Sequence, residues 1–418
     1  MKGRSYRTYL VTLLAIILAF NYVDRLFLAL ALQDIKADFR LTDSQLGLLS
    51  GIAFALFYSL MGVPIARLAD RSNRAKIITV TTLLWSVAVA LCGLVQSFVQ
   101  LLSTRVLVAV GEAGCIPPAH SLIADYFSRS ERAKAVAHYM LGVPLSVLIG
   151  YFVAGWLNQF YGWRLTFVTL SIPGIVLALI AGWSLQEPRN RVGASPTRPL
   201  SVHVMAKSLW RNRTFRHLVL GYAVLYFFTY GIGQWQPAFF IRSYGLKTGE
   251  LGTWFGIIYG VGGLIGTYWG GWLATRYASG NERLQLRGVA VAYCGLSILT
   301  FLTYLSPTAY VAFPLMAVAA IGVYTTTGPL FATIQTLVPD PMRATAVAVI
   351  YLFANLVGMG LGPLAAGVLS EALQPVAGQE SLRYALLLLC PGYLWGAWHL
   401  WWASGTVEAD QHELSDAR

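Results

Sequence analysis

Four charged side chains lie within apolar stretches that are long enough to cross a membrane. Asp24 and Arg25 interrupt the apolar run at residues 10–32, and Arg105 and Glu112 lie in a second such run. A charge near the centre of a bilayer costs roughly 2.5–3.5 kcal/mol on insertion scales. We therefore expect these two acids and two bases to face a protein interior or a watery cavity, where intramembrane charges usually mark the pathway of an ion or substrate.

The same residue types could couple a proton to an anion. Burial raises the pKa of a carboxyl group and a nearby arginine lowers it, so Asp24 and Glu112 are candidate proton carriers. Arg25 and Arg105 suit an anionic substrate, because a guanidinium stays charged and pairs bidentately with carboxylate or phosphate. Asn21 would add an amide beside them. The alternative is a charge cluster that only locks two helices together.

The spacing of these residues predicts how helices would present them. Arg105 and Glu112 are nearly two helical turns apart, so both should project from one helix face about 10 Å apart. The chain of 418 residues is 56% hydrophobic and only 11% charged, whereas soluble proteins carry about 25% charged residues. Twelve apolar stretches of about 20 residues or more, the length that spans a bilayer, lie between residues 9 and 403. They predict an all-α membrane protein with little chain left for a soluble domain.

The net charge of +12 could indicate nucleic-acid binding, but its distribution favours another explanation. If consecutive predicted spans cross the membrane in opposite directions, most Lys and Arg residues lie on the same side of the membrane as the N-terminus. By the positive-inside rule, both termini should then lie in the cytoplasm. The basicity therefore reports topology and contact with membrane lipids, and we expect no nucleic-acid partner.

A polar, proline-containing segment divides the spans six and six. It covers residues 187–214, between an N-terminal bundle of residues 1–186 and a C-terminal bundle of residues 215–418 with a short cytoplasmic tail. The halves resemble each other at an offset of about 205–211 residues, as expected for the internal repeats of transporters, whose binding site lies between the repeats.

Small residues also recur at every fourth position in one span of every three. Such stripes let two helix backbones approach closely, and we expect them to form the contact between the halves. The stripes are Gly47, Gly51 and Ala55; Ser146, Gly150 and Ala154; Gly262, Gly266 and Gly270; and Gly358, Gly362 and Ala366.

The second half offers aromatic and polar side chains instead of charges. Its predicted spans include Tyr226 and Tyr230, one helical turn apart. A cavity charged on one wall and aromatic on the other would suit an amphiphile with an anionic head. Alternatively, these aromatic residues face lipid or neighbouring helices.

The loop after the second span carries a further group of charges. Asp70, Arg71 and Arg74 could anchor that helix end on the cytoplasmic side. A carboxylate among cations could also pair in one conformation and separate in another, so these three residues are candidates for conformational gating.

Two signatures resemble a known family. The sequence from Leu68 to Arg74 resembles the loop signature Gly-x-Leu-Ala-Asp-Arg-x-Gly-Arg-Arg of the major facilitator superfamily, with Asn73 in place of the second glycine. Arg105 with Gly111 resembles that family's signature in the fourth span. The resemblance covers essentially the whole chain and implies twelve transmembrane helices in two pseudo-symmetric six-helix bundles around a central cavity.

Residues 21–25 and 105–114 look like the spinster branch of that family. That branch is linked to export of sphingoid-base phosphates and lysophospholipids. The resemblance implies that Asp24, Arg25, Arg105 and Glu112 form the functional charge network. The compact length looks like a bacterial member, which would be placed in the inner membrane.

We therefore expect a monomeric secondary active transporter that moves an amphiphilic anion by alternating access and is coupled to protons. A carrier of small organic anions or drugs is the alternative within transport. An intramembrane lipid enzyme or a sensor is the alternative outside it, but the six histidines show no nucleophile–base pattern. The chain has no phosphate-binding Gly-x-x-x-x-Gly-Lys-(Ser/Thr) motif, and we expect no cofactor or metal.

Overall fold

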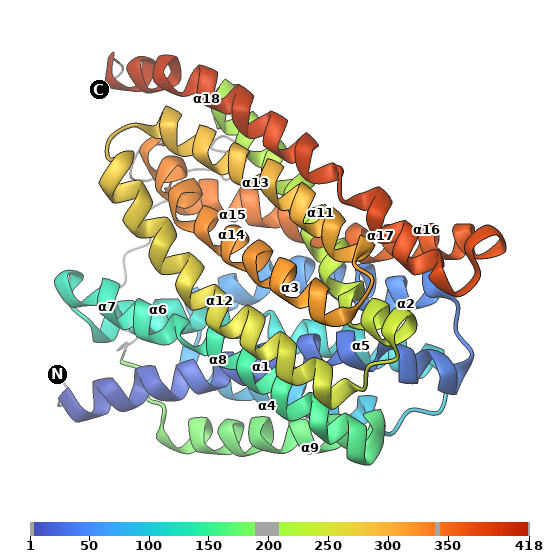
Figure 1. Ribbon diagram of the computed structural model, residues 1–418. Helices are drawn as coiled ribbons and strands as arrows, with labels where there is room; N and C mark the ends of the chain where they lie inside the picture. Colours follow the sequence, from blue (N-terminus) through green and yellow to red (C-terminus); the bar gives the residue numbers. More distant parts are fainter. Residues whose placement is uncertain (1–3, 189–208, 339–342, 417–418) are drawn as a thin grey trace. The chain divides into compact units, whose positions relative to one another are not determined.

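A computed structural model describes residues 4–188, 209–338 and 343–416 (Figure 1), and these residues contain helices and no strand. The helices before the central linker are α1 (Arg4–Phe39), α2 (Asp43–Ser50), α3 (Ile52–Arg71), α4 (Arg74–Cys92), α5 (Phe98–Glu112), α6 (Ile116–Tyr126), α7 (Arg129–Met140), α8 (Gly142–Leu148), η1 (Ile149–Val153) and α9 (Ala154–Ser184). Those after it are α11 (Arg213–Tyr244), α12 (Thr248–Tyr277), α13 (Glu282–Leu305), α14 (Ala309–Thr336), α15 (Arg343–Phe353), η3 (Ala354–Leu361), α16 (Gly362–Ala377), η4 (Gly378–Glu380), α17 (Ser381–Leu389) and α18 (Gly392–Asp416).

The chain forms two compact units. Unit 1 comprises Met1–Ala194 together with Gly245–Gly256, and unit 2 comprises Ser195–Tyr244 together with Ile257–Arg418. The boundary between the units thus falls inside α12. Most of the predicted linker at 187–214 lies outside the described residues.

The helices are long and apolar enough to cross a membrane, as the sequence predicts. Eight segments meet that standard by length and composition, and two of them, Lys134–Ser184 and Ala346–Gln411, are long enough to cross twice. α11 and α12, of 32 and 30 residues, are also long enough to span a bilayer, which brings the crossings that the described residues can provide to twelve. The predicted twelve-helix, all-α membrane fold is confirmed.

Local signals set where the helices begin and turn. The Asn73 side chain accepts a hydrogen bond from the backbone N–H of Lys76 at the start of α4, which satisfies one of the unpaired donors of a helix N-terminus. Within α9 the backbone turns at Gly162, which has a φ of 76° and lies between two spans. Glycine takes this left-handed conformation without the steric penalty that a side chain would add.

A capping box begins α7 and ties it to the first helix. Glu131 caps the Ser128 backbone, and Arg7 of α1 lies 2.5 Å from the Glu131 carboxylate. The Ser128 hydroxyl, and after it Arg7, hold the pKa of Glu131 below its usual range. Because both side chains are near the surface, this pair contributes little stability.

Two π-helical segments occupy equivalent places in the two halves. They begin at Ile149 and Ala354, at the offset of about 205 residues that relates the sequence repeats. In η1, Gly150 packs against Val23 and Leu26 of α1, and in η3, Gly358 packs against Tyr226 of α11. The π-segments therefore lie beside the helical turns that carry predicted site residues.

Several glycines of the predicted stripes make close contacts within one unit. Gly266 and Gly270 of α12 pack against α14, and Gly358 and Gly362 pack against α11. These contacts lie inside unit 2, and Gly150 likewise contacts α1 inside unit 1. These five glycines therefore bring helices of the same unit together, and the predicted contact between the halves stays a prediction.

The core of unit 1 fixes the end of α5, where one predicted site residue lies. The buried Trp85 of α4 fits between Gly111 of α5 and Gly174 of α9, and a Cβ added at either glycine would come within 3 Å of Trp85. Glu112 follows Gly111 directly, so this packing sets its position.

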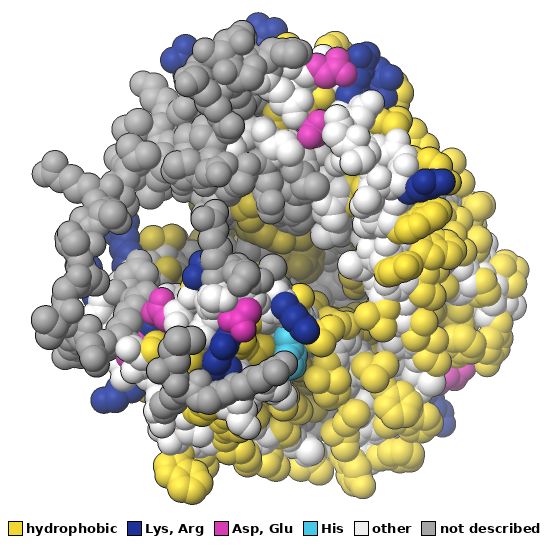
Figure 2. Space-filling model, turned by 90° about the vertical axis from the view of Figure 1, so that its left-hand side faces the viewer, with side chains coloured by type: hydrophobic (Ala, Val, Ile, Leu, Met, Phe, Trp, Pro, Cys, Tyr) yellow, Lys and Arg dark blue, Asp and Glu magenta, His cyan; other side chains and the backbone are white. Residues whose placement is uncertain are grey.

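The surface is rich in hydrophobic side chains, as expected of a membrane protein. On the face drawn in Figure 2, hydrophobic side chains cover wide areas, especially at the lower right, while charged side chains are few. Exposed tryptophans add to this apolar surface, and several of them, such as Trp398 and Trp402, lie on α18.

Candidate functional site

Two buried ion pairs join α1 to α5. Arg105 Nη1 lies 2.5 Å from Asp24 Oδ2, and both side chains are almost wholly buried. Arg25 Nε donates to Glu112 Oε2 over 2.6 Å, and Glu112 is fully buried. The four charged residues predicted from the sequence therefore meet in one cluster, with each acid paired to the base on the other helix.

The two acids also face each other. Glu112 has Asp24 within reach of a side-chain hydrogen bond, although two ionised carboxylates have no proton to share. Asp24 Oδ1 and Glu112 Oε1 are buried and have no hydrogen-bond partner among the described residues. A buried acceptor without a donor is unfavourable, and one proton held between the carboxyl groups would satisfy both oxygens.

Arg25 is the most accessible of the four side chains. It is 16% exposed, compared with 2–3% for Arg105 and Asp24 and none for Glu112. Its guanidinium lies over three aromatic rings, at 4.6 Å from Tyr22, 4.4 Å from Phe54 and 4.8 Å from Tyr58. Cation–π contacts of this kind stabilise a desolvated cation by about 2 kcal/mol or more.

Two of the three aromatic residues around Arg25, Phe54 and Tyr58 of α3, are not among the predicted site residues. Phe54 and Tyr58 are one helical turn apart, and their rings stack at 5.5 Å. Aromatic pairs at this spacing are common in membrane helices, so the sequence signal is weak. Only the position of Arg25 on the neighbouring helix singles them out.

Asn21 lies one turn before the charged pair on α1. Its side chain is fully buried, and neither its amide nitrogen nor its amide oxygen has a hydrogen-bond partner among the described residues. Buried amides are normally bonded, so this side chain is available to a bound water molecule or a ligand group.

The helix that carries the second acid ends beside it. α5 ends at Glu112, and Gly114 and Cys115 make bonds back to Gly111 and Glu112 before α6 begins. Discontinuous spans of this kind are typical of the binding regions of transporters.

The predicted aromatic residues of the second half form a ladder on α11 of unit 2. The rings of Tyr222 and Tyr226 are 4.5 Å apart and those of Tyr226 and Tyr230 are 5.3 Å apart. The Tyr222 hydroxyl donates to the Tyr226 hydroxyl over 3.1 Å. Tyr226 and Tyr230 therefore present one continuous face, and Tyr222, which the sequence analysis does not select, extends it.

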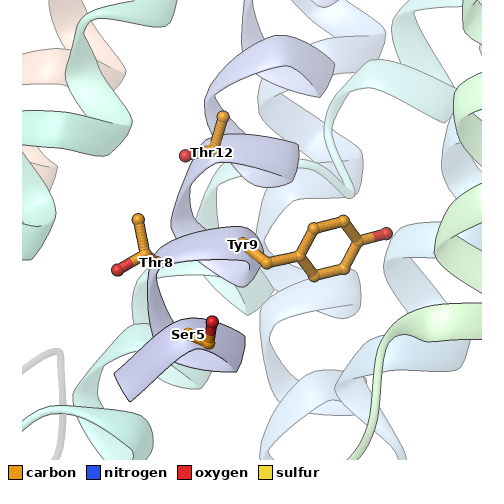
Figure 3. Close-up of a pocket in the computed structure, with 4 residues that line it drawn as sticks. All are labelled: Ser5, Thr8, Tyr9 and Thr12. Atoms are coloured by element: carbon orange, nitrogen blue, oxygen red, sulfur yellow. The ribbon is translucent and has the colours of Figure 1, made fainter. Parts of the chain in front are cut away.

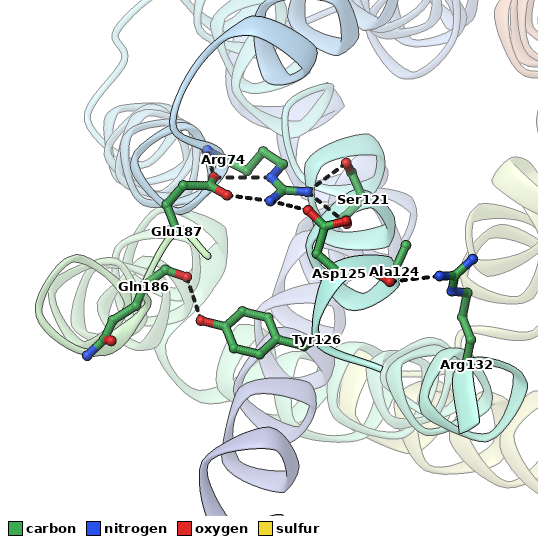
Figure 4. Close-up of polar contacts among 8 residues, drawn as sticks. All are labelled: Arg74, Ser121, Ala124, Asp125, Tyr126, Arg132, Gln186 and Glu187. Carbon is green, nitrogen blue, oxygen red and sulfur yellow. Dashed lines mark hydrogen bonds and ion pairs between the residues drawn. The ribbon is translucent and has the colours of Figure 1, made fainter. Parts of the chain in front are cut away.

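A second charged cluster surrounds Arg74, one of the predicted gating residues (Figure 4). The Arg74 side chain is fully buried, pairs with Glu187 and lies 2.6 Å from Asp125 Oδ2. Arg74 Nη1 also donates to the Ser121 carbonyl over 2.9 Å. This arginine therefore connects the start of α4 to the end of α6 and to the segment after α9.

Of the other two predicted gating residues, Arg71 makes none of these contacts. Arg71 is exposed at the end of α3, and the Asp70 side chain lies outside the described residues. The acids that pair with Arg74 are Asp125 and Glu187, which sequence reasoning did not select because each stands alone near a helix end.

Replacing Arg74 with lysine should lower the free energy of unfolding by about 2 kcal/mol. Lysine keeps the charge but cannot reproduce the planar fork of donors, and hydrogen bonds to charged groups contribute about 1.5–3 kcal/mol. The measurement is thermal or denaturant unfolding in detergent, with the exposed Arg71→Lys as a control expected within about 0.5 kcal/mol of the parent. Equal stability of the two variants would contradict the role of the Arg74 cluster.

An open pocket of about 560 Å³ lies along the beginning of α1 (Figure 3). It is lined by Ser5, Thr8, Tyr9 and Thr12, and Thr12 Oγ1 lies 3.3 Å from His138 Nε2. Its lining offers hydroxyl groups and no carboxylate or arginine, so it is distinct from the predicted charged site.

The model of the Major Facilitator Superfamily matches residues 14–363. The chain belongs to this superfamily. An MFS-type efflux pump of Mycolicibacterium smegmatis is 33% identical over 405 residues, which cover 96% of this chain and 93% of that protein. Protein spinster homolog 1 of Xenopus laevis is 28% identical over 93% of this chain and 79% of that protein.

A solved structure gives the same assignment. The crystal structure of a bacterial homologue of the human lysosomal transporter spinster, inward-facing and unoccupied, is similar with a TM-score of 0.85. It is 29% identical, and the match covers 98% of this chain and 99% of that one. The chain is thus a spinster-like transporter of the major facilitator superfamily and an integral membrane protein, and the alternative of an intramembrane enzyme is set aside.

Proposed function

We propose that this transporter moves an amphiphilic anion, such as a lysolipid or sphingoid phosphate, by alternating access coupled to protons. The observation that carries the proposal is the pair of facing carboxyl groups, Asp24 and Glu112, each bound to an arginine and each with one unpartnered oxygen. Such a cluster can hold a proton or release it, and its net charge changes when it does.

Protonation would free the more accessible arginine. A proton entering between the two acids neutralises one carboxylate, and the ion pair between Glu112 and Arg25 then weakens. The Arg25 side chain is the only one of the four that is partly exposed, and its guanidinium can take the phosphate or carboxylate of a substrate bidentately. Asn21 is positioned one turn away to donate its amide to the same head group.

We assign Arg105 a second role within the substrate-binding group. It is almost wholly buried against Asp24, so it holds that carboxyl group in place while Arg25 exchanges partners. It would contact a substrate only after Asp24 is protonated. Proton and anion therefore compete for the same set of charges.

The tyrosine ladder of unit 2 would bind the apolar body of the substrate. Tyr226 and Tyr230 offer ring faces together with hydroxyl groups, which suits the boundary between an acyl chain and a polar head. The identity of 33% to an efflux pump supports a second candidate, a proton-coupled carrier of small organic anions or drugs.

The moving bodies would be residues 1–186 and 215–418, joined by residues 187–214, in a monomer. The excess of Lys and Arg on one side supports an inner-membrane location with both termini in the cytoplasm. Asp70, Arg71 and Arg74 would then lie at the cytoplasmic end, where the pairs made by Arg74 would stabilise one of the conformations.

The test is ligand-induced thermal stabilisation, screened across lysolipids, sphingoid phosphates, small organic anions and drugs. A lysolipid or sphingoid phosphate should raise the melting temperature of the parent, and Arg25→Gln should abolish that shift. Arg164→Gln is the matched control, because Arg164 pairs with Asp38 on the surface.

The outcomes separate the candidates. Stabilisation by small anions or drugs alone would favour the second one. Stabilisation by lipids that survives in Arg25→Gln would contradict the assigned binding group, and no stabilisation by any anion would contradict the proposal itself.

A further inference from the structure

α13 and α18 lie side by side and antiparallel within unit 2 (Figure 1). Tyr293 of α13 stacks on Tyr393 near the start of α18, with the ring centroids 6.2 Å apart. Arg283, near the start of α13, pairs with Glu408, near the end of α18. Both helices belong to segments that are long and apolar enough to cross a membrane. The end of the helix pair where α13 begins and α18 ends therefore lies at one membrane surface.

Arg287 of α13 lies near this end without an acidic partner. It follows Arg283 by one helical turn, so it is about 6 Å deeper in the span. Its guanidinium lies 5.1 Å over the Trp401 ring of α18, and its Nε is buried with no hydrogen-bond partner among the described residues. Glu408 pairs with Arg283 instead, and no described carboxylate pairs with Arg287. A cation inside a span needs a compensating partner, and here the described residues supply an aromatic ring but no anion.

Arg283 is also incompletely paired. Its Nη1 lies 3.2 Å from Glu408 Oε2, and the two side chains are 43% and 56% exposed. Its Nε is buried and has no hydrogen-bond partner in the part of the chain that the structure describes. Ion pairs as exposed as this one contribute little stability, so Arg283 can exchange Glu408 for a stronger anion at small cost. The two arginines, one turn apart on α13, can therefore donate to the same anion.

Open space lies beside these arginines at Gly405 of α18. Gly405 follows Trp401 by four residues and precedes Glu408 by three, so the three residues share one helix face. That face contacts α13, since Trp401 lies against Arg287 and Glu408 pairs with Arg283. Gly405 is exposed, and a Cβ added there would meet no atom within 4 Å. Packing within the protein does not require this glycine, and its space is open to another molecule.

The chemistry of these residues suits the head group of an anionic phospholipid. Arginine binds phosphate bidentately, and basic pockets between membrane helices bind anionic head groups. Trp398, Trp401 and Trp402 are each about half exposed. Tryptophan is enriched at the depth of the head groups, where its apolar ring and its N–H donor both find partners. A free anion would use the arginines but not these rings, so the combination favours a lipid.

We propose that Arg283, Arg287 and Trp401 form a binding site for the phosphate group of an anionic phospholipid on the surface of unit 2, with Gly405 leaving room for its glycerol backbone. The lipid would be a bound component of the surrounding membrane and not the transported molecule, because these residues lie outside the charged cluster of α1 and α5. The inference goes beyond the proposed function, and each of the two can fail without the other.

The test is native mass spectrometry of the delipidated full-length protein, titrated with phosphatidylglycerol or with zwitterionic phosphatidylethanolamine. The parent should bind phosphatidylglycerol more tightly. Arg287→Gln should weaken that binding by about tenfold, because charge-assisted bonds to the phosphate are lost. Arg276→Gln is the matched control, since it removes the same charge from an exposed position at the end of α12 and should leave the affinity close to that of the parent.

Gly405→Leu keeps every charge but fills the open space, so it should also weaken binding, and it decides the question if Arg287→Gln does not fold. Gly295→Leu is its control, because a Cβ there likewise meets no atom within 4 Å but lies two turns beyond Arg287. Parental affinity in folded Arg287→Gln and Gly405→Leu would overturn the proposal, as would equal losses in the controls or equal binding of the two lipids. Displacement of the lipid by inorganic phosphate would also overturn it, in favour of a site for a free anion.

Discussion

Replacing Arg105 with glutamine is expected to abolish transport and to lower the free energy of unfolding by about 3–5 kcal/mol. The substitution leaves the Asp24 carboxylate buried without its cation, and breaking a buried ion pair by removing one partner has a cost of this size. The aromatic environment supplies no replacement, because the nearby Phe54 ring interacts favourably with a cation and not with an anion.

The measurement is unfolding in detergent together with transport in liposomes. The double variant Asp24→Asn with Arg105→Gln should recover a large part of the stability but none of the transport, since it removes both charges together. The exposed pair of Arg164 and Asp38 provides the control, and Arg164→Gln should cost no more than about 1 kcal/mol. If Arg164→Gln and Arg105→Gln lowered the free energy of unfolding equally, the prediction that burial makes the pair of Arg105 and Asp24 more costly to break would be wrong.

Glu112→Gln is expected to remove the response of transport to a pH gradient. A gradient of one pH unit supplies about 1.4 kcal/mol for each coupled proton, which corresponds to tenfold accumulation of substrate. The glutamine has nearly the shape of glutamate and can still accept a bond from Arg25, but it cannot carry a proton. The parent should therefore accumulate substrate about tenfold for each coupled proton, and the variant should only equilibrate it.

The experiment compares gradient-driven uptake with exchange at equal pH in the same liposomes. Exchange should persist in Glu112→Gln while accumulation is lost. Glu131→Gln is the control, because that carboxyl is at the surface and paired with Arg7. Accumulation that remains gradient-dependent in Glu112→Gln would rule out this residue as the proton carrier.

Much of the fold follows from sequence because membrane helices have a strong compositional signal. Apolar length alone predicts the spans, and Gly162 shows where one long helical segment turns back. The clustering of Asp24, Arg25, Arg105 and Glu112 is also predictable, since charges in apolar helices must find one another.

Other features depend on three-dimensional packing that spacing does not report. Sequence does not reveal that each acid pairs across helices, or that Phe54 and Tyr58 enclose Arg25. The glycine stripes are visible, but small residues permit close approach without specifying the partner. Gly266, Gly270, Gly358 and Gly362 pack inside unit 2, and the predicted contact between the halves stays a prediction.

The two π-helical segments have a consequence for the history of the chain. A π-turn differs from an α-turn by one additional residue, and such turns are rare. Their presence at Ile149 and Ala354, at matching places in both halves, is most simply explained if the extra residue was already present in a single ancestral half before the gene duplicated. On this account the π-turn is older than the chemical difference between the halves. The charged side chains of the first half and the tyrosines of the second then arose after the duplication, on a backbone that both halves had inherited.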